Sequence, residues 1–279
     1  MIVASIDASP SLARLRALTL ARGQVALWWI GQAGFAARIG DALVLLDPFV
    51  SPRPERLVPP AFAAAAATGV DAVLCSHEHW DHFDAPALAA IAEASPAARF
   101  VVPAPLVDDA AALGIERTRI VAARVEQPLH VAGLTIRPVP ACHGIEMRDA
   151  YGFGEGRFLG YVLDDGAVRV YHAGDTIVYA GLPQLLRELE VDVALLPING
   201  RDHFRESVEG IVGNMDHREA ARLADEARVD LLIPMHYEMF AANRGYPAHL
   251  VEVARRDHPR VAVALPSRER IFVYTATRS

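Results

Sequence analysis

The chain has 279 residues, of which 52% are hydrophobic, so it can bury a sizeable core and is not disordered as a whole. Its formal charge of −7 argues against binding nucleic acid through a basic surface. All 27 basic residues are Arg, which excludes a lysine Schiff base, a lysine general base and a P-loop lysine.

The apolar segments are too short for a membrane protein. No stretch reaches the roughly 20 apolar residues of a membrane span, and the first residues show no charged start followed by an unbroken apolar run. We therefore expect a soluble cytoplasmic protein with no membrane partner, either a monomer or a homo-oligomer. Cys75 and Cys142 lack a CxxC spacing and are expected to be buried, reduced thiols.

The predicted elements open with strands and short helices. Up to residue 113 we expect a helix over 11–22, strands over 25–30, 35–39 and 42–46, a helix over 61–68, a strand over 71–75, a helix over 85–94, a strand over 100–102 and a helix over 106–113. Antiparallel strands joined by Gly-containing turns are then expected over 129–131, 134–139, 159–163 and 168–171.

Helices and strands alternate again towards the C-terminus. We expect a helix over 182–189, a strand over 191–196, a helix over 217–227, a strand over 231–234, a helix over 247–258 and a strand over 271–274 that closes a sheet. This order predicts an α/β (α+β) fold, a four-layer αββα sandwich of two mixed β-sheets with helices outside. No domain boundary stands out, so residues 1–279 are expected to form a single domain.

A histidine-rich pattern follows the strand predicted over 71–75. His77, His79, Asp81 and His82 form the pattern His-x-His-x-Asp-His. Imidazole and carboxylate are ligands suited to zinc, manganese and iron. A turn after a strand can aim residues two apart into one site while the next pair faces a neighbouring site, so the spacing suits two metal ions. The alternative interpretation is a polar loop that is rich in histidine by chance.

Three further candidate ligands each follow an apolar run. They are His143 in Pro-Ala-Cys-His-Gly, Asp175 in His-Ala-Gly-Asp-Thr and His236 in Pro-Met-His-Tyr. In this order the motifs resemble those of the metallo-β-lactamase superfamily, hydrolases of the αββα fold with two metals, and the resemblance runs from about residue 25 to residue 240.

The resemblance implies a division of the ligands between two metal ions. One ion would be held by His77, His79 and His143, the other by Asp81, His82 and His236, and Asp175 would bridge them. The segments WWIGQAG (28–34), LDPF (46–49), PINGRD (197–202) and GNMD (213–216) resemble the L-ascorbate-6-phosphate lactonase-like branch, which implies lactone or ester hydrolysis. We therefore expect the substrate to be a small anionic lactone, ester or phosphoester.

The expected chemistry follows from two divalent ions, Zn²⁺ or Mn²⁺. They can share a water, lower its pKa from about 15.7 toward about 7, and present the resulting hydroxide to a carbonyl or phosphoryl group that one ion polarises. Asp81, which can also shuttle a proton, and His236 are the predicted catalytic residues. Covalent catalysis has no support, because there is no Gly-x-Ser-x-Gly elbow and Cys75 lies inside a predicted strand.

Other polar residues have predicted roles around the metals. Asn199, Arg201 and Tyr237 are the predicted substrate-binding residues, with the Arg fork suited to a small anionic substrate; a surface salt bridge is the equal alternative for Arg201. Asp47 is expected to bond loop amides or a metal-ligating histidine. Asp216 is expected to cap a helix together with Glu219.

Two other functions remain open from the sequence. A phosphodiesterase or nuclease would share the same metal motif, although the negative charge and the lack of lysine disfavour a nucleic-acid partner. A metal-dependent sensor without enzymatic activity is the second alternative.

Overall fold

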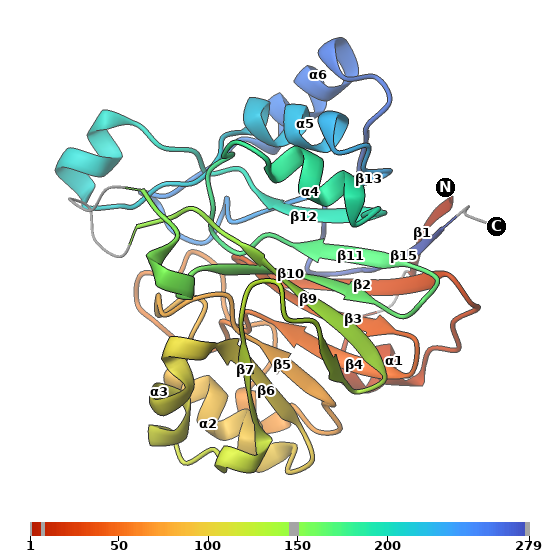
Figure 1. The fold of residues 1–279 in the computed structure, drawn as a ribbon, viewed down its shortest axis with the longest axis vertical. Coiled ribbons are helices and arrows are strands. Elements are labelled where there is room, and N and C mark those ends of the chain that lie inside the picture. The colour runs from red at the N-terminus through yellow and green to blue at the C-terminus, as the bar shows by residue number, and fades with distance from the viewer. Residues whose placement is uncertain (1, 7–8, 145–150, 277–279) are drawn as a thin grey trace.

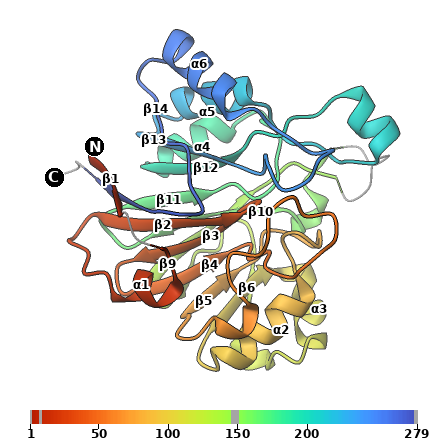
Figure 2. The same cartoon turned by 180° about the vertical axis from the view of Figure 1, so that it is seen from behind.

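The computed structural model describes residues 2–6, 9–144 and 151–276. Within these ranges fifteen strands form two sheets that lie against each other, and helices cover the outer face of each sheet (Figures 1 and 2). The predicted architecture of two mixed sheets with helices outside is confirmed.

The first sheet has eight strands in the order β1-β15-β2-β3-β4-β5-β6-β7. Neighbours pair antiparallel from β1 to β4 and parallel from β4 to β7. The strands are β1 (Ile2–Ile6), β2 (Gln24–Gly31), β3 (Gly34–Ile39), β4 (Ala42–Leu46), β5 (Ala72–Leu74), β6 (Arg99–Pro103), β7 (Ile120–Ala123) and β15 (Ile271–Thr275).

The second sheet has seven strands in the order β14-β13-β12-β11-β10-β9-β8. It is antiparallel from β8 to β11, as predicted, and parallel from β11 to β14. The strands are β8 (Leu129–Val131), β9 (Leu134–Pro140), β10 (Leu159–Asp164), β11 (Arg169–His172), β12 (Val193–Pro197), β13 (Leu231–Met235) and β14 (Ala262–Val263).

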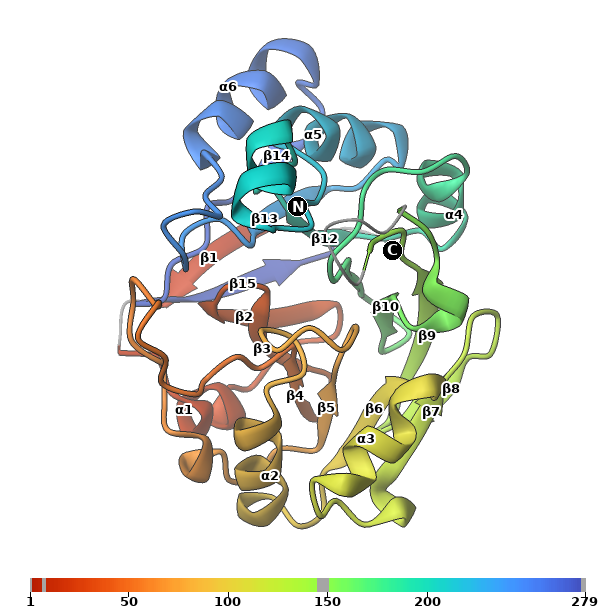
Figure 3. The same cartoon turned by 90° about the vertical axis from the view of Figure 1, so that its left-hand side faces the viewer.

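The helices lie on opposite outer sides of the two sheets (Figures 1 and 3). Those on the first sheet are α1 (Leu12–Ala17), α2 (Ala85–Ala94) and α3 (Val107–Ala112), and those on the second are α4 (Leu182–Glu188), α5 (His217–Glu226) and α6 (Pro247–Asp257). Short helical turns are η1 (Ala64–Ala66), η2 (Ala104–Leu106), η3 (Arg117–Arg119), η4 (Gly154–Gly156) and η5 (Arg205–Glu209). In the part of the chain that is described, every helix is too short or too polar to span a bilayer.

The central strands are buried on both faces. In β4, Val44 and Leu46 belong to the core between the sheets, whereas Leu43 and Leu45 belong to the core under α1 and α2. Successive side chains of a strand point to opposite faces, so a strand with a core on each side needs an unbroken apolar run. This is why β4 reads in the sequence as a continuous apolar segment.

Two predicted helices were wrong in extent. The helix predicted over 11–22 ends at Ala17, and further along the Ala21 amide donates to the side chain of Gln24 (2.8 Å). The helix predicted over 61–68 is only the single turn η1, because Ala67 is the one fully buried residue of that run and no apolar face stabilises a longer helix.

Three strands were missed by the sequence analysis, and all three are edge strands. β1 and β7 are the edges of the first sheet, and β14 is an edge of the second. An edge strand pairs on one side only and is often short, so its hydrophobic pattern is weak.

The N-terminus of α5 generates a test of stability. Asp216 accepts hydrogen bonds from the Arg218 and Glu219 amides, and Glu219 bonds back to the Asp216 amide, which is the predicted capping box. We expect Asp216→Ala to lower the free energy of unfolding in urea by about 1 kcal/mol, and Asp216→Asn, which keeps a capping oxygen, to cost much less. Equal losses in both variants would contradict the capping role.

Candidate metal centre

The predicted ligands come from the carboxyl ends of strands in both sheets. The segment from His77 to His82 follows β5 of the first sheet. His143 follows β9, Asp175 follows β11 and His236 directly follows β13, all in the second sheet. Strands in the two layers therefore direct side chains into the same space between them.

The first group of ligands contains three imidazoles and one carboxylate. His77, His79, His143 and Asp175 each offer a ligand atom, and these atoms all lie within 4.8 Å of one another. His77 Nε2 lies 2.9 Å and His143 Nε2 lies 3.3 Å from His79 Nδ1. Nitrogen atoms with lone pairs converge here on one point.

The second group contains Asp81, His82 and His236, whose ligand atoms also lie within 4.8 Å of one another. Asp175 contacts both groups, because its Oδ1 lies 3.3 Å from His82 Nε2 and its Oδ2 lies 3.2 Å from His236 Nε2 and 3.7 Å from His143 Nε2. The structure thus brings all seven predicted ligands together, in the two groups that the resemblance implies.

Burial and charge make this cluster suited to cations. His82 and Asp175 are buried, and within the described residues neither His82 Nε2 nor Asp175 Oδ1 makes a hydrogen bond of acceptable geometry, although they face each other. Buried polar atoms of this kind need a partner. A divalent ion between imidazole nitrogens and carboxylate oxygens supplies one, so the residues fit two metal ions.

The pKa values of two histidines of the cluster are shifted in opposite directions. Burial lowers the pKa of His143 to about 3, so its ring is neutral and has a lone pair for a metal. Burial also lowers the pKa of His236, but Asp175 and then Asp81 outweigh it and raise the pKa to about 9. Without a metal, a proton on His236 therefore balances the carboxylates.

Asp47 supports the cluster through hydrogen bonds to Ser76 and His82. Its Oδ1 accepts the Ser76 amide (2.7 Å), and its Oδ2 accepts the Ser76 hydroxyl and His82 Nδ1, both at 2.6 Å. His82 Nδ1 is thereby fixed as a donor, which leaves Nε2 to face Asp175. The predicted role of Asp47, bonding a loop amide and a candidate ligand histidine, is confirmed.

Gln32 is a site residue to which the sequence analysis assigned no role. Its side-chain Nε2 donates to Asp81 Oδ2 (2.7 Å) and lies 3.0 Å from His236 Nε2. Its backbone carbonyl oxygen accepts a hydrogen bond from the His236 backbone amide (2.9 Å). Its φ of 54° turns the chain sharply at the end of β2. The only local signal was its position between glycines in WWIGQAG, directly after a strand.

A cavity of about 400 Å³ opens onto the cluster. The candidate ligands His79, Asp81, Asp175 and His236 form one side of it. The remaining lining residues are mostly apolar and are Trp80, Gly210, Ile211, Val212, Phe240, Ala242 and Asn243. Sequence analysis assigned no role to Asn243, Ile211, Val212 or Phe240, because the loops that contain them carry no periodic pattern.

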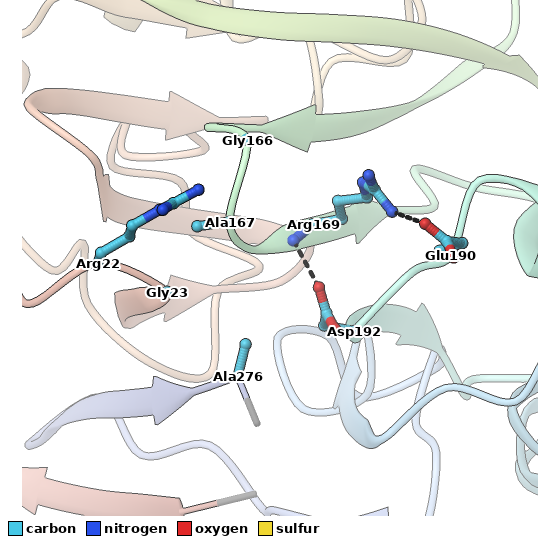
Figure 4. A pocket seen from close by; sticks show the side chains of 8 residues that line it. All are labelled: Arg22, Gly23, Gly166, Ala167, Arg169, Glu190, Asp192 and Ala276. Atoms are coloured by element: carbon cyan, nitrogen blue, oxygen red, sulfur yellow. Dashed lines mark hydrogen bonds and ion pairs between the residues drawn. The ribbon is translucent and has the colours of Figure 1, made fainter. Parts of the chain in front are cut away.

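A larger cavity of about 540 Å³ lies beside Arg22, Gly23 and the turn before β11, and Figure 4 shows its lining. Within its wall the Arg169 side chain contacts Glu190, and the Arg169 amide donates to Asp192 (2.8 Å). It contains no histidine or cysteine, so its size alone does not make it a candidate for metal chemistry.

The three predicted substrate-binding residues lie outside the cavity lining. Arg201 forms two hydrogen bonds with Glu219, at 2.7 and 2.9 Å, which corresponds to the salt-bridge alternative. Tyr237 is buried and stacks on Trp29, with ring centroids 5.0 Å apart. Asn199 is buried and donates to the side chain of Asn243, which does line the cavity. Direct substrate binding by these three residues stays a prediction.

The two cysteines take no part in the cluster. Both are buried and free, as predicted. Burial, together with the nearby Asp47 carboxylate, raises the pKa of the Cys75 thiol well above its usual value, so it is no nucleophile at neutral pH.

Two mixed sheets with a His/Asp cluster at the carboxyl ends of strands from both sheets define a protein of the metallo-β-lactamase fold. A profile of the beta-lactamase superfamily domain matches residues 43–237. A UPF0173 metal-dependent hydrolase of Myxococcus xanthus is 30% identical over 253 residues, which cover 88% of this chain and 82% of the relative. The chain belongs to the metallo-β-lactamase superfamily.

Solved structures agree on the fold. Igni18, a metallo hydrolase from Ignicoccus hospitalis, aligns with a TM-score of 0.72 at 23% identity, over 91% of this chain and all (100%) of that one. The isothiocyanate hydrolase from Delia radicum gut bacteria aligns with a TM-score of 0.71 at 19% identity, over 90% of this chain and 100% of that one.

The hydrogen bond from His82 to Asp47 generates a prediction about metal affinity. Asp47→Asn weakens the acceptor that orients His82, and we expect Zn²⁺ affinity, measured by calorimetry, to fall by about 10- to 100-fold. Asp84→Asn is the matched control, because Asp84 is also a buried carboxylate but bonds the amides of Val50, Ser51 and Ala87. An equal loss of affinity in the control would show that the effect is only structural.

The contact of Gln32 with Asp81 generates a second prediction. Gln32→Leu removes the donor to Asp81 Oδ2 and frees the carboxylate to rotate, so we expect the weaker of two bound cations to lose about tenfold or more in affinity while the tighter is retained. Gln24→Leu is the control, since Gln24 lies on the same strand but bonds Ala21 and Thr275. A metal titration that resolves two binding steps measures both affinities. If the affinity of the second step is unchanged in Gln32→Leu, Gln32 does not position Asp81.

Proposed function

We propose that this chain is a hydrolase that holds two divalent cations, Zn²⁺ or Mn²⁺, and cleaves a small ester or lactone. The observation that carries the proposal is the pair of ligand groups that share the buried carboxylate of Asp175. The names of the curated relatives, metal-dependent hydrolases, support the reaction class. The resemblance of four loop segments to the ascorbate-6-phosphate lactonase-like branch supports a lactone or ester rather than an amide.

Each residue of the cluster has a role in this proposal. His77, His79 and His143 would hold one cation, Asp81, His82 and His236 the other, and Asp175 both. When bound, two such cations lower the pKa of a water molecule and polarise the carbonyl oxygen of the substrate. Most of the candidate ligands are buried, and the neighbouring cavity wall is mostly apolar.

Asp81 is the carboxylate placed to move a proton. It lines the cavity and its side chain is 13% exposed, whereas Asp175 is more deeply buried at 4%. Burial raises the pKa of Asp81, but His82 and His236 outweigh this and hold the pKa well below its usual range, so the group is ionised at neutral pH. It can accept a proton from water and pass it to the leaving group.

A phosphodiester substrate is the second candidate for the same site. The described residues that line the cavity include two carboxylates and no Arg, so a polyanion such as RNA finds no counter-charge there beyond the metals. We therefore rank ester or lactone hydrolysis above nuclease activity.

Metal removal tests the proposal directly. We expect hydrolysis of an ester and lactone panel to disappear on treatment with a chelator and to return with Mn²⁺ or Zn²⁺, with two equivalents bound per chain. His79→Ala and His236→Ala each remove one ligand from one of the two groups, so each variant should bind only one equivalent. Activity that is indifferent to the chelator would overturn the proposal.

Two further substrates, added to the ester and lactone panel, distinguish the alternative functions. Bis(4-nitrophenyl) phosphate tests for phosphodiesterase activity, and an aryl isothiocyanate tests the reaction named for one structural neighbour. Faster turnover of the phosphodiester would favour the phosphodiesterase, and fewer than two bound metals with no turnover of any substrate would favour a sensor.

A further inference from the structure

The cavity beside the metal centre has one apolar wall, held in place by aromatic contacts. Trp80 and Phe240 pack edge to face with ring centroids 5.3 Å apart, and Phe49 lies 5.3 Å from the Trp80 ring and 6.0 Å from the Phe240 ring. Trp80 is nevertheless 44% exposed, so a large part of it faces open space. Ile211 and Val212 extend the apolar wall beyond the turn η5.

The arginines of the neighbouring loops are not among the described residues that line this cavity. Arg201 is bonded twice to Glu219, and Arg205 donates to the backbone carbonyl oxygens of Asn199 and Arg244. Arg53 stacks over the Trp80 ring, 4.1 Å from its centroid, and does not line the cavity. Among the described lining residues the ionisable groups are carboxylates and imidazoles of the metal cluster.

The remaining polar contact of the wall is a neutral amide. Asn214 Nδ2 donates to Asn199 Oδ1 (3.1 Å), and Asn199 Nδ2 donates to Asn243 Oδ1 (2.8 Å). This chain of amides engages the oxygen of Asn243, which is a lining residue, so the group that Asn243 can offer to a ligand is its Nδ2 donor. A neutral donor recognises an uncharged carbonyl or ether oxygen without requiring an anion.

We infer that the substrate carries an uncharged, apolar acyl or alkyl group, which packs against Trp80, Phe240, Ile211 and Val212 while an oxygen of the substrate accepts from Asn243. This inference rests on the proposed function and replaces the anionic substrate expected from Arg201. An anionic tail packed against this apolar wall would leave water and, among the described lining residues, would gain no counter-charge beyond the metals, so its desolvation would be poorly compensated.

Two metal-chelating probes of equal length test the inference by binding rather than by turnover. Hexanohydroxamic acid ends in a methyl group, and adipic monohydroxamic acid ends in a carboxylate. On the Zn²⁺-loaded full chain we expect the alkyl probe to bind on the order of tenfold or more tighter in calorimetry. Each further methylene of the alkyl probe should tighten binding by up to about fourfold until the cavity is filled.

Matched variants locate the effect. Ile211→Arg places a cation in the wall and should reverse the preference towards the carboxylate probe. Val208→Arg adds the same charge to a side chain that is 66% exposed and does not line the cavity, and it should leave the preference unchanged. Thermal unfolding of both variants checks that they remain folded.

The outcomes separate this inference from the proposed function. Equal binding of the two probes, or tighter binding of the carboxylate probe, would overturn the inference while the metal-dependent hydrolysis stands. If neither probe binds the metal-loaded chain, no cation is accessible from the cavity, and both the inference and the proposed function fail.

Discussion

The buried carboxylate of Asp175 is the interaction on which the site depends. It follows a strand of the second sheet and contacts His82 from the first sheet as well as His143 and His236 from its own. This contact requires close packing of the layers: a Cβ added to Gly174 would lie 2.6 Å from the Cβ of Ser76. The glycine before Asp175 is therefore part of the metal site, because it lets the two strand ends approach.

Three of the eight non-glycine residues with positive φ in the described chain lie at the same place. Gln32, Asp47 and His236 each follow a strand directly and have positive φ values of 54°, 40° and 59°. Such conformations cost about 1–3 kcal/mol each and persist only where the surroundings enforce them. Here the enforcing bonds are visible, since the His236 amide donates to the Gln32 carbonyl across the two sheets and Asp47 is held by Ser76 and His82. The strain turns each side chain back towards the centre of the cluster.

Charge is distributed in two zones around this centre. The carboxylates Asp81 and Asp175 lie among imidazoles in a buried cluster, which favours bound cations, and the described residues that line the cavity include no arginine. The arginines of the adjoining loops are instead bonded to Glu219 and to backbone oxygens. An arginine beside the cluster would compete with the metals for the same carboxylates. Because these arginines are bonded elsewhere, the carboxylates stay available as ligands. The described cavity residues outside the cluster are mostly apolar, together with the side-chain amide of Asn243.

The sequence by itself indicated the candidate ligands and the central strands. His77 to His82, His143, Asp175 and His236 each stand within a few residues of the end of a continuous apolar strand, and that local pattern is readable without the fold. Capping by Asp216 is equally local, since its partners are two and three residues away.

Tertiary structure alone decided the partners of Gln32, Arg201 and Asn199. Gln32 meets Asp81, 49 residues away, and His236, 204 residues away; Arg201 bonds Glu219 across 18 residues; and Asn199 reaches the cavity only through Asn243. The weakly patterned edge strands β1, β7 and β14 likewise became evident only in the assembled sheets. The physical reason is the same in each case: these contacts arise where two sheets and their loops pack together, and no periodicity within one segment encodes a partner in another.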